Sequence, residues 1–348
     1  MRGNVPHAPI GRVLDTEMER PENNMRSGDA IIAASLLSLM LVATSHRPRA
    51  GDQFEGMRPP EATLGQIRAG NERFWAAFAA RDLWSIGRLW AKTDAVSAIF
   101  PAGSTPFVGW ENIRESFRRS FAHNRDVRVD AQVVSVRAEG TAAWLVDAVR
   151  FEAVQTQTGQ PVVMDRILGT KLFERSGDGQ WRLIHFHVHF PGFSIPNPTQ
   201  HKPMKLEPSV QPPAHDDVAR ASAAFYDAFT TRDLEAMARV WAPDDDVSAI
   251  HPSTPAPFLG PGEVMKSWKQ AFSDIEMVHI RPRFSIQHVS GSVAWVVDMN
   301  EFHALLAERT APVHLHNVLS TQIFERREGQ WLMVHYHGQI GFSFDHAD

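Results

Sequence analysis

Apolar and polar positions alternate along this chain in two ways, first at helical spacing and then at strand spacing. Residues 64–80 and 217–231 carry apolar side chains three and four positions apart, which predicts amphipathic helices. A second short helix is expected after each Arg-Asp-Leu sequence, because Asp82 or Asp233 can accept hydrogen bonds from the first turn. A third helix is predicted over 109–123.

Long stretches with a period of two follow these helices, and this period is typical of strands. In the first half of the chain they are residues 127–139, 141–155, 162–175 and 181–190. Three helices followed by a curved antiparallel sheet make an α+β arrangement. One face of the sheet would pack on the helices, and a curled sheet can enclose a pocket on its concave face.

The same order of elements occurs a second time. An offset of 151 residues aligns 74–147 with 225–298 without a gap, and 26 of the 74 aligned positions are identical. The alignment resumes at Thr170 and Thr321 and includes the closing strands, which read WRLIHFHVHF and WLMVHYHGQI. Similarity of this extent within one chain indicates a duplicated domain.

The duplication sets the predicted domain boundaries. We expect one domain at 62–193 and a second at 216–344. Residues 194–215 contain six prolines and should form an extended connector between them. An N-terminal extension, 1–50, and a short linker, 51–61, precede the first domain.

The N-terminal extension contains one uncharged hydrophobic segment, 30–43, which follows Arg26. Its 14 residues are short for a membrane-spanning helix, which needs about 20, but fit the hydrophobic region of a secretory signal. We therefore expect an exported protein, periplasmic or secreted, that contacts a membrane only through this segment if it is not cleaved. A buried helix of a folded domain is the alternative reading.

Composition excludes several classes of function. The formal net charge is −5 and there is no long basic run, so no nucleic-acid partner is expected. The chain contains no cysteine, which excludes disulfides, thiolate nucleophiles and thiolate metal sites. It also contains no phosphate-binding loop, dinucleotide fingerprint or nucleophile elbow, and we expect no cofactor.

The order of elements and the Trp-to-His closing strand resemble the NTF2-like superfamily, and within it the SnoaL-like and ketosteroid-isomerase-like domains. The resemblance covers both copies. It implies that each copy forms a cone around an apolar cavity that takes a small-molecule ligand. It also implies that the two copies pair through their sheets as an intramolecular pseudo-dimer.

The resemblance to ketosteroid isomerases can be followed residue by residue. Pro252 and Gly260 keep the family spacing after the catalytic aspartate, and His251 occupies the position of that base. Phe225 stands where the family has its oxyanion tyrosine, and Ser320 where it has a protonated aspartate. The isomerase trio is therefore absent. The first copy has Phe100, Phe74 and Gly169 at the three positions.

Histidines are the main candidates for chemistry in the first copy. His185, His187 and His189 alternate along the closing strand, so their side chains share one face of the sheet. We expect this face to line the cone. His187 and His189, together with Asp147, would then contact a bound molecule.

The second copy offers a more complete set. If His251 and His337 both line its cone, they can act as general base and general acid near neutral pH. Asp298 can orient one of these imidazoles, and Ser320 and Phe225 are expected to contact the substrate. This set predicts isomerase-, dehydratase- or cyclase-like chemistry on a small, largely apolar compound, or simple binding of it.

A metal site is one alternative. His314 and His316 alternate on a neighbouring strand and could meet His335 and His337. However, alternate side chains on a strand lie about 6.6–7 Å apart, which is long for two ligands of one ion. We therefore assign no metal ligands.

Two further alternatives need no chemistry. The histidines can be neutral, hydrogen-bonded parts of an internal interface, which we favour for His185 and His335. The cones can also be filled by their own aromatic side chains, for example Phe258, Phe272 and Phe302. The protein would then be a non-catalytic binding or protein-interaction module.

Overall fold

A computed structural model describes two folded units in this chain. The described residues are 60–101, 103–190, 216–252, 254–307 and 312–341. The predicted signal segment, 30–43, and the predicted connector, 194–215, lie outside them. Among the helices of the described residues, none is both long and apolar enough to cross a membrane. We use "first unit" for residues 60–190 and "second unit" for residues 216–341.

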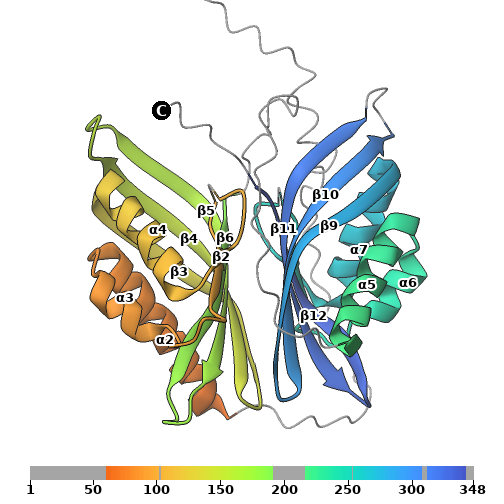
Figure 1. The fold of residues 1–348 in the computed structure, drawn as a ribbon, viewed down its shortest axis with the longest axis horizontal. Coiled ribbons are helices and arrows are strands. Elements are labelled where there is room, and N and C mark those ends of the chain that lie inside the picture. Colours follow the sequence, from red (N-terminus) through yellow and green to blue (C-terminus); the bar gives the residue numbers. More distant parts are fainter. Residues whose placement is uncertain (1–59, 102, 191–215, 253, 308–311, 342–348) are drawn as a thin grey trace, which may run out of the picture.

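The first unit has three helices followed by four long strands, with two short strands between the second and third helices (Figure 1). The helices are α2 (Glu61–Ala79), α3 (Leu83–Leu89) and α4 (Trp110–His123). The strands are β1 (Ser97–Ile99), β2 (Phe107–Val108), β3 (Asn124–Glu139), β4 (Ala142–Gln155), β5 (Pro161–Arg175) and β6 (Trp181–His189).

The second unit repeats this order. Its helices are α5 (Asp216–Thr231), α6 (Leu234–Val240) and α7 (Gly260–Asp274). Its strands are β7 (Ser248–Ile250), β8 (Phe258–Leu259), β9 (Ile275–Ser290), β10 (Val293–Leu306), β11 (Val313–Arg327) and β12 (Gln330–Ile340). The predicted caps are confirmed, because Asp82 accepts a hydrogen bond from Ser85 N and Asp233 accepts one from Ala236 N.

Each unit forms a six-stranded sheet. The last strand of the unit, β6 or β12, lies in the interior of that sheet. The orders are β2-β1-β6-β5-β4-β3 and β8-β7-β12-β11-β10-β9. Neighbouring strands are antiparallel except β1 with β6 and β7 with β12, which are parallel. Register shifts between Val149 and Phe151 on β4, and between Met299 and Asn300 on β10, mark irregularities that bend the long strands.

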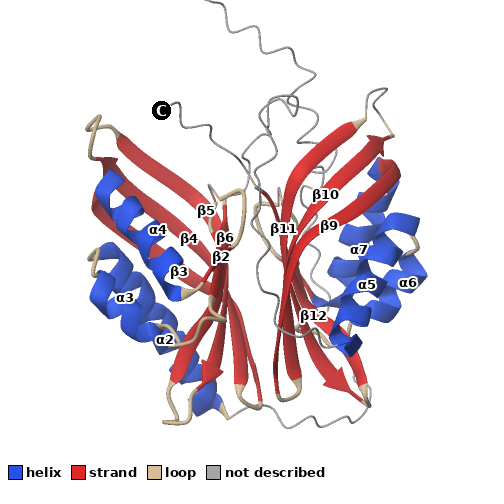
Figure 2. Ribbon diagram, in the orientation of Figure 1, coloured by secondary structure: helices blue, strands red, loops and turns tan. Residues whose placement is uncertain are grey.

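The two sheets lie back to back, and the helices cover their outer faces (Figure 2). Each sheet therefore has one face on its own helices and one face toward the other unit. Side chains cross between the units: Thr170 Oγ1 of β5 lies 2.9 Å from His335 Nε2 of β12. The predicted α+β fold with two repeated halves, paired as an intramolecular pseudo-dimer, is confirmed.

Candidate functional site

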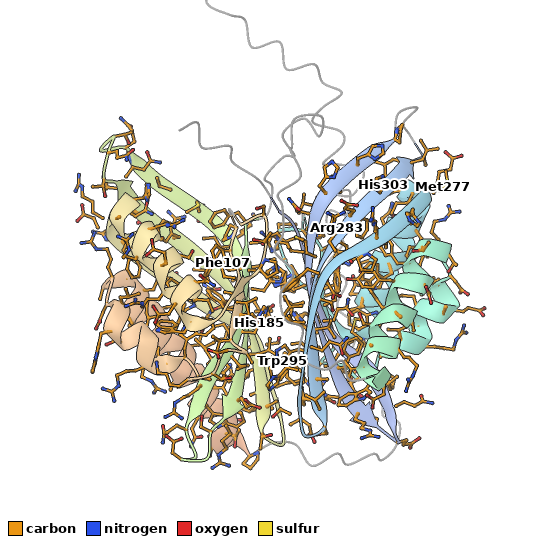
Figure 3. The ribbon with its side chains drawn as sticks, viewed as in Figure 1. Phe107, His185, Met277, Arg283, Trp295 and His303 are labelled. Carbon is orange, nitrogen blue, oxygen red and sulfur yellow. The ribbon has the colours of Figure 1, made fainter. Side chains whose placement is uncertain are left out.

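The face of the histidine row is set by its neighbours on β6. Phe186 lies between His185 and His187, and its ring packs 5.2 Å from that of Phe74 on α2. Because successive side chains of a strand point to opposite faces, the histidines point away from the helices. His185 Nε2 and His187 Nδ1 each lie 2.9 Å from Thr321 Oγ1 of the second unit. Figure 3 shows His185 between the two sheets.

The second unit contributes the same groups in return. Thr170 Oγ1 of the first unit lies 2.9 Å from His335 Nε2 and 2.8 Å from His337 Nδ1. The rings of His187 and His337 stack face to face, 3.6 Å apart and 6° from parallel. We call this set the histidine interface; its members are Thr170, His185, His187, His189, Thr321, His335 and His337.

These imidazoles are neutral because they are fully buried. Burial lowers the pKa of His185, His189 and His335 to about 3. The pKa values of His187 and His337 lie well below their usual range, first because of burial and then because other imidazoles surround them. The alternative that His185 and His335 are neutral, hydrogen-bonded interface residues is what the structure shows.

The orientation predicted for three candidate residues is wrong. His187, His189 and His337 were expected to line a cone, but they lie between the sheets, where His189 Nδ1 is 2.8 Å from His337 Nε2. A period of two places the histidines on one face, and only the apolar residues between them indicate which face that is. His337 therefore cannot share a substrate with a group on the helix side of its sheet.

His251 does lie on the helix side of the second sheet. Its ring is 4.4 Å from Trp268 and 5.3 Å from Phe258, and its Nε2 lies 3.0 Å from Ser267 Oγ. Because Ser267 Oγ donates to Val264 O, His251 Nε2 must donate to Ser267. Burial lowers the pKa of His251 to about 4, so this imidazole is neutral at neutral pH. The proposed His251–His337 pair is separated by the sheet.

The four imidazoles of the metal alternative do not meet. On β11, Thr321 pairs with His337 and Ile323 with His335. His314 and His316 lie farther along β11, and His314 pairs instead with His303 of β10. Within the described ranges, no group of three or more potential ligands is arranged to hold a metal ion.

Asp298 lies inside the second unit, where no histidine of the described residues is hydrogen-bonded to it. It accepts hydrogen bonds from Tyr226 Oη at 3.0 Å and from Gln322 Nε2 at 3.1 Å. Ser320 Oγ and Asn300 Nδ2 lie 3.0 and 2.8 Å from the same tyrosine hydroxyl. Burial raises the pKa of Asp298 to about 6, although the hydrogen bonds oppose this shift. Its predicted role in orienting an imidazole is therefore wrong.

The corresponding place in the first unit holds a buried ion pair. Asp147 Oδ2 accepts hydrogen bonds from Lys171 Nζ at 2.7 Å and from Trp75 Nε1 at 2.6 Å. Both charged side chains have no exposed surface. The ammonium group also lies 4.3 Å from the centroid of Trp75 and 4.6 Å from that of Phe186, within cation–π range. Burial lowers the pKa of Lys171, and Asp147 partly offsets this.

Gly169 leaves room for this pair. A Cβ atom built at Gly169 would lie 2.2 Å from Asp147 Oδ1, so any side chain there would displace the carboxylate. The second unit has Ser320 at the same position, where its hydroxyl takes part in the Tyr226 network. A few residue differences therefore separate two kinds of interior, one ionic and one of neutral hydrogen bonds around a carboxyl group.

The first unit contains an apolar cavity of about 390 Å³ between its sheet and helices. Trp75, Phe117, Phe186 and Phe100 form much of its wall. Its polar lining consists of Ser116, Ser120 and Asn124, which lie one turn apart along α4 and at its end. No titratable side chain is among the described residues that line it. The cavity is of the size that binds small molecules.

In the second unit, larger or more polar side chains stand at some of the matching positions. Trp268 replaces Phe117; it is 1% exposed, and its ring lies 5.3 Å from Phe225 and 5.4 Å from Tyr336. Asn300 replaces Val149 and is held by Tyr226. The predicted substrate contact Phe225 is thus part of an aromatic core.

Sequence reasoning missed Lys171 and Tyr226, and signals for both were present. Lys171 lies within an otherwise alternating apolar strand, where a charged residue is rarely buried without a partner. Tyr226 directly follows Phe225, the position that was compared with the family tyrosine. The repeated Thr170 and Thr321 also marked a shared structural need.

Comparisons with known proteins agree with this architecture. The sequence matches the SnoaL-like domain over residues 67–192 and again over 218–342. The F-box protein SKIP8 of Arabidopsis thaliana is 30% identical over 128 residues, which are 35% of this chain and 49% of that protein. The chain thus matches about half the length of this relative.

Solved structures of the same kind align with about a third of the chain. A ketosteroid isomerase-like protein from Erwinia carotovora is 18% identical, with a TM-score of 0.33, and covers 36% of this chain and 95% of its own. An NTF2-like superfamily protein from Salmonella enterica is 19% identical, with a TM-score of 0.34, and covers 38% and 94%. The assignment rests on the two domain matches, which span more than half of the sequence. The chain belongs to the SnoaL-like domain family and carries two copies of that domain.

Proposed function

We propose that the protein binds a small, largely apolar and uncharged molecule in the cavity of its first unit. The observation that carries this proposal is the lining of the 390 Å³ cavity, which is aromatic and aliphatic except for Ser116, Ser120 and Asn124. A charged ligand would lose its hydration there without gaining a partner. The two hydroxyl groups and the amide can orient one polar group of the ligand.

The same lining favours binding over acid–base chemistry in this cavity. General acid–base catalysis needs a titratable group within about 2.6–3.2 Å of the moving proton, or one water away. The part of the cavity wall that the structure describes offers none, and Lys171 lies behind Trp75 and Phe186, engaged with Asp147. The second unit would then serve mainly as the fixed partner against which the first sheet is held.

A fluorescence titration tests the proposal. The neutral dye N-phenyl-1-naphthylamine should bind saturably, and Met164→Trp, at the half-buried edge of the cavity, should weaken binding at least about 10-fold by filling space. Leu315→Trp, at the matching half-buried position of the second unit, is the control and should leave the affinity unchanged. Absence of saturable binding, or equal effects of the two variants, contradicts the proposal.

We also propose that residues 30–43 direct export of the chain. The proposal is supported by the uncharged run after Arg26, whose length suits a signal sequence better than a membrane span. Expression of the full chain and of a form that begins at residue 51 should place the first outside the cytoplasm and leave the second inside it. The same location for both forms would contradict the proposal.

A further inference from the structure

A second candidate binding site lies on the surface of the first unit. It is a groove of about 950 Å³ formed by α2, α3 and the beginning of β6, and it shares no lining residue with the apolar cavity. Four cationic side chains line it: Arg73, Arg88, Lys92 and Arg182. This groove is independent of the function proposed above.

The two carboxylates of the groove do not neutralise all of these cations. Asp82 accepts hydrogen bonds from Ser85 as the cap of α3, and Asp178 is paired with Arg182. Within the described parts of the chain, neither Arg73 nor Arg88 has a carboxylate partner, and both are exposed. The groove therefore presents a positive surface on a chain whose formal net charge is −5.

An exposed tryptophan lies in the same groove. Trp84 is 68% exposed, and the guanidinium of Arg88 lies 4.7 Å from the centroid of its ring. Together they form a flat surface that is apolar in the ring and charged at the edge. Tryptophan and arginine are the residues that most often dominate binding energy at protein interfaces.

The matching groove of the second unit shows that the fold does not need Arg73, Trp84, Lys92 or Arg182, although Arg239 matches Arg88. It has a volume of about 570 Å³ and is lined by two cations, Arg220 and Arg239, and two acids, Asp217 and Asp227. At the positions of Arg73, Trp84, Lys92 and Arg182 the second unit has Ala224, Glu235, Pro243 and Leu332. The positive charge and the exposed indole are thus specific to the first unit.

We propose that the groove of the first unit docks an acidic peptide segment of another protein. Carboxylates of the peptide would pair with Arg73 and Arg88, and an apolar side chain would cover the Trp84 ring. Opposite charge gives such a complex its register and its sensitivity to salt, and coverage of the indole removes apolar surface from water.

Fluorescence anisotropy with the full-length protein tests this docking site. The probe is a fluorescein-labelled peptide of glutamates and leucines, and a peptide of lysines and leucines serves as its charge control. The acidic peptide should bind saturably and more weakly as salt is added. Arg73→Ala with Arg88→Ala should weaken binding at least about 10-fold, and Trp84→Ser should do the same.

The second unit supplies the matched control, Arg220→Ala with Arg239→Ala, which should leave binding unchanged. Three results would each overturn the proposal. The first is no saturable binding of the acidic peptide at low salt. The second is an equal effect of the two arginine pairs. The third is displacement of the probe by inorganic polyphosphate as effective as by unlabelled peptide, because that would show a general anion site.

Discussion

At the scale of single residues, the two units differ most clearly around one carboxyl group. Asp147 pairs with Lys171 at 2.7 Å, whereas Asp298 is surrounded by neutral donors and has its pKa raised to about 6 by burial. The substitutions are few: Lys171 corresponds to Gln322, and Gly169 to Ser320. A buried charge needs a partner of opposite charge, and a buried carboxyl group that lacks one is shifted toward its neutral form.

Loss of the lysine should therefore destabilise the first unit strongly. We expect Lys171→Met to lower the free energy of unfolding of the first unit by about 3–5 kcal/mol, because Asp147 would remain buried without its partner. The double variant Lys171→Met with Asp147→Leu should recover most of this loss, since no buried charge remains. The measurement is urea denaturation of the wild type, the single variant and the double variant. If Lys171→Met were as stable as the wild type, the buried ion pair would be contradicted.

At the scale of elements, alternation along β6 and β12 decides what each sheet face can do. The sequence predicts the helices, their caps and the long strands, because these depend on local spacing. The side on which the histidines lie could also have been predicted. Ile184 and Phe186 alternate with them, and such apolar residues belong under the helices. Local spacing cannot predict the contact of His187 with Thr321, which lies 134 residues away in the sequence.

The cavity could be predicted only in outline, for a related physical reason. Which cone is open depends on side-chain volumes at several distant positions. Phe117 in the first unit corresponds to the larger Trp268 in the second, whose ring lies 5.3 Å from Phe225 and 5.4 Å from Tyr336. A tightly packed interior leaves little room for compensation, so differences of this size decide whether space remains. The sequence shows the substitutions but not the distances.

At the scale of the whole molecule, buried and charged contacts join the units. Besides the histidine interface, Arg137 of the first unit lies 2.8 Å from Glu325 of the second, and His288 of the second lies 3.4 Å from Glu174 of the first. These pairs occupy matching positions in the two copies. Trp295, which lies on the same side of its sheet, stacks on His288 at 4.3 Å. The contact between units is thus an extension of the protein core.

This contact should make the stability of the protein strongly dependent on pH. The folded pKa values of His185, His189 and His335 are about 3, and those of His187 and His337 also lie well below the value of about 6.5 for an unfolded chain. The unfolded chain therefore binds more protons below pH 6.5. The contribution of these neutral imidazoles to the free energy of unfolding is fully present above that pH. It is lost as the pH falls toward 3, by up to about 7 kcal/mol per pH unit if all five histidines gain a proton on unfolding.

Urea denaturation between pH 7.5 and pH 4.5 measures this dependence. His187→Phe with His337→Phe keeps two stacked rings but removes two titrating groups, so the slope of stability against pH should become shallower whatever the stability at pH 7.5. His123→Phe, at the exposed end of α4, is the control. A slope unchanged by the interface pair would show that these imidazoles do not gain protons on unfolding.

The face-to-face rings of His187 and His337 also bear on how the two copies can change. Around them three pairs of residues are identical in the two copies, Ser97 and Ser248, His185 and His335, and Thr170 and Thr321, whereas His189 corresponds to Gln339. A mutation here must suit both halves at once, since each half supplies the hydrogen bonds of the other. A mutation deep beneath the helices meets only its own half. In a dimer of identical chains, every mutation would occur in both subunits. Because the two copies here lie on one chain, the interior of each can change separately. One half can therefore specialise while the other half keeps the shape of the interface between them.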